Sequence, residues 1–396
     1  MFLGREKELA LLKDEFETKK KSAILVYGKR RIGKSALISE ASKFFDGIVI
    51  NHLCVKSNYE GNLALLSRSV CSSLFLPEIQ FNTIFDLFDF LKLQNKKILL
   101  ILDEYQYFKQ SLKDTSIDSY MQSIIDGLSE NIKLVLCGSF ITMMKELVEE
   151  SNSLFGRFSL VIHLQEFNYL DAAKFFPNLV YSDRIAFYSV FGGSPYVLSI
   201  LDYTKSLEEN IEKYLIDQNS ILRTYIENVM LSEIRQSFDV RILELIGNGK
   251  KRYSEISSSL IHSDTGLLDK QLKNLISMET ISKVFPINKK GDKKYQFYEI
   301  KDNLMRFYFS YIFGNESFIS KFGENYFYKN YIEKSINTFI SLRVENIAVQ
   351  YFSHLVRIGK RQNILDVGSY WYDDRKNKKN GQFDCVLKEN DGYTFY

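Results

Sequence analysis

Short apolar runs alternate with amphipathic stretches along the first 165 residues. Two runs are continuously apolar, AILVY at 23–27 and ILLIL at 98–102, and a third, NIKLVLCG at 131–138, is mostly so. Continuous apolar runs of this length are typical of parallel strands that are buried on both faces. Because helical patterns lie between them, residues 1–165 are predicted to form an α/β fold around a parallel sheet.

The rest of the chain predicts three further parts. Residues 166–235 have a helical pattern throughout and are expected to form an all-α lid. Residues 236–313 have three helical segments followed by the strands SKVFPI and YQFYEI, which is the order of a winged helix. Residues 314–396 are expected to form a second α/β domain, and its last residues, FDCVLKENDGYTFY, are typical of a hairpin. The aromatic stretch at 302–315 is interpreted as an interdomain core.

Composition narrows the function classes. Lys and Arg number 52 against 49 Asp and Glu, a net charge of +3, so any nucleic-acid contact must come from a local patch. The four Cys are scattered without a CxxC pair, and with only four His they argue against zinc and for reduced thiols. The start, MFLGREKEL, is charged where a signal peptide needs an apolar run, and no run of eighteen apolar residues occurs. A cytoplasmic protein without a membrane span is expected.

The most informative motif follows the first apolar run. Gly28 stands five residues before Gly33-Lys34-Ser35, which fits GxxxxGK[ST], and a helical pattern follows. Such glycines let backbone N–H groups wrap a phosphate chain, and the helix N-terminus adds partial positive charge. Lys34 is expected to reach the β- and γ-phosphates, and Ser35 to ligate Mg²⁺. The residues predicted to bind nucleotide here are Gly28, Lys29, Arg30, Arg31, Ile32, Gly33, Lys34, Ser35 and Ala36. A glycine-containing surface turn is the alternative, and the flanking strand and helix favour phosphate binding.

An acidic pair, Asp103-Glu104, ends the second apolar run. At the carboxyl end of a parallel strand, Asp103 is placed to hold Mg²⁺ through water, and Glu104 to polarise the hydrolytic water as a general base. The pair could also be only a helix cap, but the phosphate loop beside it favours catalysis. Ser139 ends the third run, and beside the other two strands its hydroxyl would report the γ-phosphate. Placement of that strand between the other two is the arrangement of additional-strand NTPases.

These residues resemble a known family, the archaeal-type ATPases of the STAND branch of P-loop NTPases, which are relatives of AAA+ proteins. The segment FLGREKELALL at 2–12 looks like the family's N-terminal motif, which implies that Gly4 and Arg5 pack near the adenine. The same residues could be only a helix start, with acidic residues near the helix dipole. The resemblance covers nearly the whole chain, and it implies ATP as the nucleotide.

Two more motifs carry the resemblance. SLFGRFS at 153–159 looks like the family's Gly-Arg motif, which makes Arg157 the candidate arginine finger; a structural ion pair is the alternative. FGGSPYVL at 191–198 looks like its GGxP motif, in which Pro195 packs on the base from the lid. A finger that acts in trans would require a neighbouring subunit, and the oligomeric state stays open.

The predicted winged helix carries lysines that suit phosphate contacts. They are Lys270 and Lys273 on the third helix, and Lys289, Lys290, Lys293 and Lys294 in the turn between the strands. Few side chains on that helix are suited to reading base edges, so sequence-specific binding is not expected. The module could equally dock a protein, and no particular protein partner is indicated.

The C-terminal part resembles the domain of unknown function that accompanies this ATPase family and looks like the PD-(D/E)xK nuclease fold. The resemblance implies that Glu345 on a helix and Asp384 on a strand correspond to metal-binding carboxylates. The E-x-K expected on the following strand is missing, because YTFY ends the sequence. The domain is then either a truncated form or a degenerate scaffold, and in both cases we expect no nuclease activity. Glu345 and Asp384 could also be ordinary surface charges.

Taken together, these features predict an ATP-hydrolysing switch that couples Mg-ATP turnover to the winged-helix and nuclease-like modules. Two other functions stay open. One is a DNA-binding regulator that uses ATP occupancy with little hydrolysis, and the other is a nuclease effector of a defence or toxin-type system.

Overall fold

The computed structural model describes residues 2–112, 116–232, 238–260, 265–374 and 376–396. The chain divides into two compact units, residues 1–165 and 166–396. The predicted boundary at 235/236 lies outside the described residues. The finer division into lid, winged helix and C-terminal domain stays a prediction.

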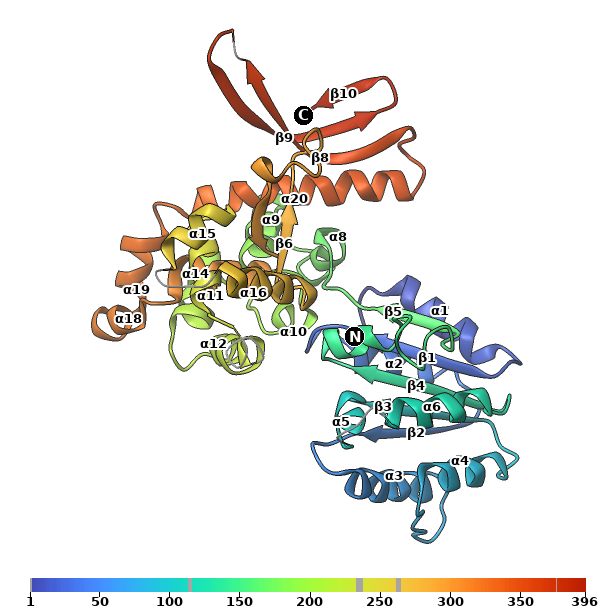
Figure 1. Cartoon of the computed structure of the whole chain (residues 1–396). Helices are drawn as coiled ribbons and strands as arrows, with labels where there is room; N and C mark the ends of the chain where they lie inside the picture. Colours follow the sequence, from blue (N-terminus) through green and yellow to red (C-terminus); the bar gives the residue numbers. More distant parts are fainter. Residues whose placement is uncertain (1, 113–115, 233–237, 261–264, 375) are drawn as a thin grey trace. The chain divides into compact units, whose positions relative to one another are not determined.

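The first unit is a five-stranded parallel sheet with helices on both faces (Figure 1). The strand order is β2-β3-β4-β1-β5, so β4 lies between the strand before the phosphate loop and the strand that ends in the acidic pair. This confirms the predicted α/β fold with a parallel sheet. Its elements are α1 (Glu6–Glu17), β1 (Ser22–Tyr27), α2 (Lys34–Ser42), β2 (Ile48–Leu53), α3 (Tyr59–Ser73), α4 (Ile84–Lys92), β3 (Ile98–Asp103), α5 (Gln106–Lys109), α6 (Ser116–Asp126), β4 (Ile132–Gly138), α7 (Ile141–Glu146) and β5 (Leu160–His163).

The continuous apolar runs are explained by burial on both faces. In β1, Ile24 and Val26 pack in the core formed with α1 and α2. The alternate residues, including Leu25 and Tyr27, pack in the core formed with α3, α4 and α6. Because side chains of a strand alternate between faces, a strand covered on both sides has no polar face to show.

The second unit contains the remaining helices and two small antiparallel sheets. Its first part comprises α8 (Tyr169–Ala172), η1 (Ala173–Phe175), α9 (Tyr181–Phe191), α10 (Pro195–Leu198), α11 (Leu207–Ile211), η2 (Glu212–Ile216), α12 (Ile221–Tyr225) and η3 (Ile226–Met230). Then follow α14 (Arg241–Gly247), α15 (Tyr253–Ser259), α16 (Thr265–Ser277), β6 (Ile281–Val284), η4 (Lys293–Tyr295) and β7 (Phe297–Ile300). This order of three helices and a two-stranded hairpin is the one expected of a winged helix.

In the last part of the second unit, several helical segments precede a three-stranded sheet, and the longest helix packs against that sheet. Its elements are α17 (Asn303–Phe307), η5 (Tyr308–Ile312), α18 (Glu316–Phe322), α19 (Glu324–Phe327), η6 (Tyr328–Ile332), α20 (Ile336–Arg357), β8 (Ile364–Asp374), β9 (Lys379–Glu389) and β10 (Gly392–Phe395). The predicted terminal hairpin is present, because β9 and β10 pair antiparallel from Gly392 opposite Glu389 to Phe395 opposite Val386. The helix α20 contacts β8 and β9.

One hydrophobic core runs through most of the second unit. It includes Phe187 of α9, Leu243 of α14, Leu272 of α16 and Phe339 of α20, all buried. The aromatic stretch at 302–315 contributes buried rings to this core, as its composition predicts. No helix among the described residues is both long enough and apolar enough to cross a bilayer.

Candidate nucleotide-binding site

The carboxyl edge of the parallel sheet gathers the side chains predicted to bind nucleotide. Strands β1, β3 and β4 are neighbours that run parallel, so the segments that follow them leave the sheet at the same edge. The phosphate loop follows β1, the acidic pair ends and follows β3, and Ser139 follows β4. The fold therefore brings together at one edge three segments that are far apart in the sequence.

The phosphate loop has the backbone that its glycines allow. Gly28 has a φ of 153° and Gly33 a φ of 91°, and Arg31 is also left-handed, with a φ of 61°. A Cβ atom on Gly28 would overlap the carbonyl oxygen of Leu164 and would come within 2.6 Å of Ile32 Cδ1. The loop thus requires glycine at its first position for space as well as for conformation.

Lys34 is buried under this loop, with 5% of the residue exposed. Its Nζ donates hydrogen bonds to the carbonyl oxygens of Gly28 (2.9 Å) and Lys29 (2.8 Å). Burial lowers the pKa of Lys34, while the nearby Glu104 and Asp103 act to raise it. A buried ammonium group that is bonded to carbonyls of its own loop is suited to exchange those carbonyls for phosphate oxygens.

Ser35 and Asp103, the two residues predicted to hold Mg²⁺, are hydrogen-bonded to each other. The Ser35 hydroxyl donates to Asp103 Oδ2 at 2.7 Å, although the two residues are 68 positions apart. A hydroxyl and a carboxylate are the hard oxygen ligands that Mg²⁺ prefers, and it keeps several waters as well. The residues present therefore fit Mg²⁺.

Glu104 follows Asp103 in an unusual backbone conformation, with a φ of 53°. Left-handed conformations of this kind cost a non-glycine residue on the order of 1–3 kcal/mol and cluster at functional sites. The Asp103 carboxylate accepts the Glu104 N–H at 2.9 Å, and the next N–H, of Tyr105, donates to the Cys137 carbonyl at 2.8 Å. These bonds fix the turn at Glu104, directly after Asp103.

The Glu104 carboxylate is bound by two residues, one of which the sequence analysis missed. Its Oε2 accepts a hydrogen bond from the Ser139 hydroxyl at 2.7 Å and another from the Gln106 side-chain amide. Ser139 was predicted near the γ-phosphate, and the structure places it beside Glu104. Gln106 belongs to none of the motifs, and a polar residue two positions after an acidic pair gives no signal in a single sequence.

Arg5 joins the N-terminal motif to the phosphate loop. Its Nη2 donates to the Ile32 carbonyl at 3.3 Å and to the Gln165 carbonyl, and the residue is 9% exposed. Gly4 and Arg5 are both left-handed, with φ of 70° and 66°. The structure thus places this motif at the loop, and its contact with adenine stays a prediction.

Arg157 is not brought to the phosphate loop of its own chain. Its Nε donates to both carboxylate oxygens of Asp126, at 3.0 and 3.1 Å. Arg157 precedes β5 and Asp126 precedes β4, so both lie towards the amino ends of these strands, whereas the phosphate loop follows the carboxyl end of β1. A finger role for Arg157 would therefore have to act on a neighbouring subunit. Pro195 begins α10 in the second unit, and its contact with the base also stays a prediction.

The turn between β6 and β7, residues 285–296 and here called the wing, packs against the C-terminal sheet. The Ile287 N–H donates to the Ser369 carbonyl at 2.7 Å. The Asn288 side chain bonds both the carbonyl and the N–H of Trp371, at 2.7 and 3.1 Å. Lys290 pairs with Asp366 at 2.6 Å. Part of the predicted DNA-binding turn is therefore engaged within the chain.

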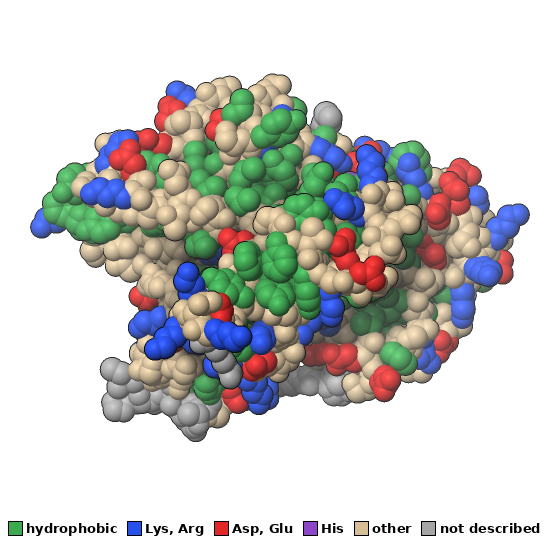
Figure 2. All heavy atoms as spheres, turned by 90° about the horizontal axis from the view of Figure 1, so that it is seen from above, with side chains coloured by type: hydrophobic (Ala, Val, Ile, Leu, Met, Phe, Trp, Pro, Cys, Tyr) green, Lys and Arg blue, Asp and Glu red, His purple; other side chains and the backbone are tan. Residues whose placement is uncertain are grey.

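The other predicted DNA-binding lysines have different surroundings. Lys270, Lys273, Lys293 and Lys294 are exposed, and Lys289 is half-buried. The ammonium groups of Lys289 and Lys294 lie over the Tyr295 ring, 5.3 and 5.6 Å from its centre. On the face seen in Figure 2, positive and negative side chains are interspersed. DNA binding stays a prediction.

Glu345 and Asp384 are close enough in the structure to influence each other. Burial raises the pKa of Glu345 to about 7, and the charges of Asp384 and Glu299 act in the same direction. Glu345 lies on α20 and Asp384 on β9, as the nuclease-like resemblance implies. A metal-binding role for them stays a prediction.

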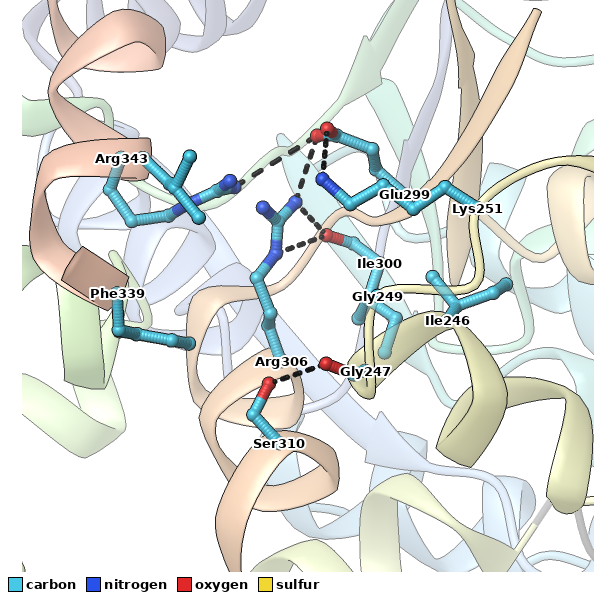
Figure 3. Close-up of a pocket in the computed structure, with 11 residues that line it drawn as sticks. Ile246, Gly247, Gly249, Lys251, Glu299, Ile300, Arg306, Ser310, Phe339 and Arg343 are labelled. Atoms are coloured by element: carbon cyan, nitrogen blue, oxygen red, sulfur yellow. Dashed lines mark hydrogen bonds and ion pairs between the residues drawn. The ribbon is translucent and has the colours of Figure 1, made fainter. Parts of the chain in front are cut away.

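Glu299 belongs to a separate cluster at a pocket between β7, α17 and α20 (Figure 3). It accepts hydrogen bonds from Arg306 at 3.1 Å and Lys251 at 3.3 Å, and Arg343 Nη1 lies 3.9 Å away. Burial acts to raise the pKa of Glu299, but the cations outweigh it and the pKa lies below its usual value. This pattern is typical of a structural ion cluster that joins neighbouring elements.

The sheet order, the phosphate loop and the acidic pair together define an ATPase-type P-loop NTPase. The family described as "ATPase domain predominantly from Archaea" matches residues 2–201. A second family, described as "Archaea bacterial proteins of unknown function", matches residues 308–396. An uncharacterized protein of Methanocaldococcus jannaschii is 30% identical over 382 residues, which cover 94% of this chain and 82% of that protein. The chain belongs to this archaeal ATPase family.

Two solved structures have a similar fold. A Walker-type ATPase of Pyrococcus abyssi is similar with a TM-score of 0.54 at 17% identity, over 78% of this chain and 96% of that one. The ORC2 protein of Aeropyrum pernix, solved in ADPNP-ADP complexes, has a TM-score of 0.50 at 13% identity, over 77% and 92%. At these identities the likeness concerns the fold alone.

Proposed function

We propose that the chain is an ATP-hydrolysing molecular switch. The observation that carries this proposal is the 2.7 Å hydrogen bond from Ser35 to Asp103 Oδ2, beside the phosphate loop on one side and Glu104 on the other. It supports a site in which the phosphate loop binds the nucleotide, Ser35 and Asp103 hold magnesium, and Glu104 acts as the general base. The ORC2 protein, whose fold is similar, is described in ADPNP-ADP complexes, which supports an adenine nucleotide as ligand.

Each residue has a distinct task in this proposal. The loop N–H groups and the Lys34 ammonium bind the phosphates, with Lys34 giving up the Gly28 and Lys29 carbonyls. Ser35 and Asp103 hold Mg²⁺, which when bound would neutralise phosphate charge. Glu104 orients the attacking water and accepts its proton.

Glu104→Gln separates binding from hydrolysis. The amide keeps the size of the carboxylate but cannot accept the proton, so ATP binding should stay within about twofold while turnover falls by about 100-fold or more. Fluorescence titration with a labelled ATP analogue and a phosphate-release assay measure the two quantities. Equal turnover in the variant and the wild type would remove Glu104 from this role.

The switch itself requires that nucleotide state changes the second unit. We propose that ATP bound at the phosphate loop favours one arrangement of the winged helix and C-terminal sheet, and that hydrolysis releases it. Limited proteolysis of the Glu104→Gln variant with ATP, ADP and no nucleotide tests this. Identical cleavage of residues 166–396 in all three states would contradict a switch.

A second candidate is an ATP-regulated DNA-binding protein with little hydrolysis. The exposed Lys270 and Lys273 on α16 and Lys293 and Lys294 in the wing support it. Fluorescence anisotropy with duplex DNA, with and without ATP and across salt concentrations, distinguishes it from the first. DNA affinity that depends on ATP in a chain with negligible turnover would favour the second candidate.

A further inference from the structure

Gln106 is a fully buried polar residue inside the candidate site, with an exposed fraction of 0%. Its amide oxygen accepts the Ser139 N–H at 3.3 Å. Its amide nitrogen donates to the Glu104 carboxylate and lies 3.2 Å from the Ser139 hydroxyl. A buried amide is costly unless its groups are paired, and here both ends are paired with residues of the site.

The backbone around Gln106 leaves room for this amide. A Cβ atom on Gly138 would lie 2.6 Å from Gln106 Oε1 and would overlap Met144 Sδ. Gly138 ends β4 directly before Ser139, so the absence of a side chain lets the amide fit between the ends of β3 and β4. The site is therefore shaped around Gln106 as well as bonded to it.

The two donors on Glu104 differ in what else they can do. The Ser139 hydroxyl has a single proton, so it can donate to Glu104 or to a phosphate oxygen, but not to both. The Gln106 amide has two N–H groups and lies fully buried, away from solvent. When Ser139 turns to phosphate, the Gln106 amide still holds the Glu104 carboxylate in place.

We propose that Gln106 is a positioning residue for Glu104, which keeps the carboxylate in place when Ser139 is recruited by the γ-phosphate. This inference rests on the proposed function, because it assumes that Glu104 is the base and Ser139 the sensor. It also assigns Ser139 a second task, which is to restrain Glu104 until nucleotide is bound.

Gln106→Met tests the proposal, since Met has a similar length but no hydrogen-bond donor. We expect the dissociation constant of the labelled ATP analogue to stay within about threefold, and kcat to fall by about 10- to 100-fold through misplacement of the base. Gln110→Met is the matched control, because Gln110 lies four residues further on and is exposed. It should turn over ATP like the wild type.

Gln106→Glu gives a second readout, in which the pH dependence of turnover reports the contact between this position and Glu104. A second carboxylate beside Glu104 disfavours ionisation of both, so the pH at which turnover is half-maximal should rise by about one unit or more. The Gln110→Glu variant should leave the pH profile of kcat in place. If Gln106→Met does not fold at the assay temperature, an unshifted pH profile in Gln106→Glu still overturns the proposal.

The outcomes distinguish this inference from the proposed function. Wild-type kcat in Gln106→Met, or an unshifted pH profile in Gln106→Glu, overturns the positioning role if Glu104→Gln is inactive. If Glu104→Gln turns over ATP normally, the proposed function fails first, and the role of Gln106 fails with it. Loss of kcat in Gln106→Met with intact nucleotide binding, together with the shifted profile, supports the inference.

Discussion

The phosphate loop and the wing are both lysine-bearing loops, but their lysines have different surroundings. In the phosphate loop, Lys34 is 5% exposed and its ammonium group is enclosed by carbonyls of its own loop. In the wing, Lys290, Lys293 and Lys294 are exposed, and Lys290 pairs with Asp366. A lysine held by backbone carbonyls under a left-handed loop is preorganised for an anion, whereas an exposed lysine only adds charge.

The two pairs of acidic residues, Asp103 with Glu104 and Glu345 with Asp384, also have different surroundings. Asp103 and Glu104 accept hydrogen bonds from Ser35, Ser139 and Gln106, and a buried lysine lies near them. Burial, together with the charges of Asp384 and Glu299, raises the pKa of Glu345 to about 7. Donors stabilise a carboxylate charge, and burial beside other acids opposes it. The first pair thus has hydrogen-bond donors on its carboxylates, whereas in the second pair Glu345 keeps its proton to a higher pH than usual.

The largest expected effect is the loss of Lys34. Lys34→Ala removes the only side-chain cation of the motif that the structure buries in the loop, so nucleotide affinity should fall by about 100-fold or more. Titration with the labelled ATP analogue measures this. Lys43→Ala is the control, because Lys43 is exposed at the other end of α2 and pairs with Glu40. Equal affinity in the two variants would mean that Lys34 does not bind the phosphates of the nucleotide.

Substitution of Arg157 tests whether this residue takes part in catalysis although it lies away from the phosphate loop of its own chain. An exposed ion pair with Asp126 predicts that Arg157→Ala and Asp126→Asn each cost less than about 1 kcal/mol of stability and leave kcat unchanged. A finger that acts in trans predicts a loss of kcat of about 10-fold or more in Arg157→Ala alone, at protein concentrations where subunits associate. Phosphate release measured across protein concentrations, with thermal melts of both variants, decides between them.

The fold of the core could be predicted because its signals are local. A continuous apolar strand, a glycine loop and a helix start occupy consecutive residues, and Lys34 and Ser35 follow from that alone. The bond from Ser35 to Asp103 and the order of the strands depend on pairing between distant segments, so the sequence could only suggest them. Gln106 was missed because its partners, Glu104 and Ser139, are defined by the ends of two different strands.

The same reason explains what the sequence could not show in the second unit. The wing lysines have the composition of a phosphate-binding turn, and nothing local indicates that Ile287 and Asn288 bond the backbone of β8. The location of Arg157 could not be predicted for the same reason, because its sequence motif does not reveal at which edge of the sheet the residue lies. Composition identified the residue types, and strand topology decided their neighbours.

Glu345 predicts a measurable dependence of stability on pH. Its pKa of about 7 lies above the ordinary value of 4.5, so the folded protein binds more protons than the unfolded one between these values. Its contribution to stability is therefore present below about pH 4.5 and is lost as pH rises to about 7. Glu345→Gln should remove this loss and stabilise the protein at pH 8 by on the order of 1 kcal/mol, after allowance for solvent screening.

Urea unfolding of both proteins at pH 5.5 and pH 8 measures the difference. Asp384→Asn is the matched variant, because it removes one of the charges that raise the pKa of Glu345. It should shift the pH-dependent loss to lower pH without abolishing it. An equal stability difference between Glu345→Gln and the wild type at both pH values would contradict the raised pKa.

The smallest effect is expected in the wing. If wing lysines contact DNA phosphates, Lys293→Ala should lower affinity a few-fold and reduce the slope of log affinity against log salt by about 1. Lys290→Ala should change the slope less, because Lys290 already pairs with Asp366 at 2.6 Å. Lys321→Ala, an exposed lysine on α18, is the control for a general charge effect. Equal slopes in all three variants would mean that the wing lysines do not contact DNA phosphates. The main role of the wing would then be its packing against β8 through Ile287 and Asn288.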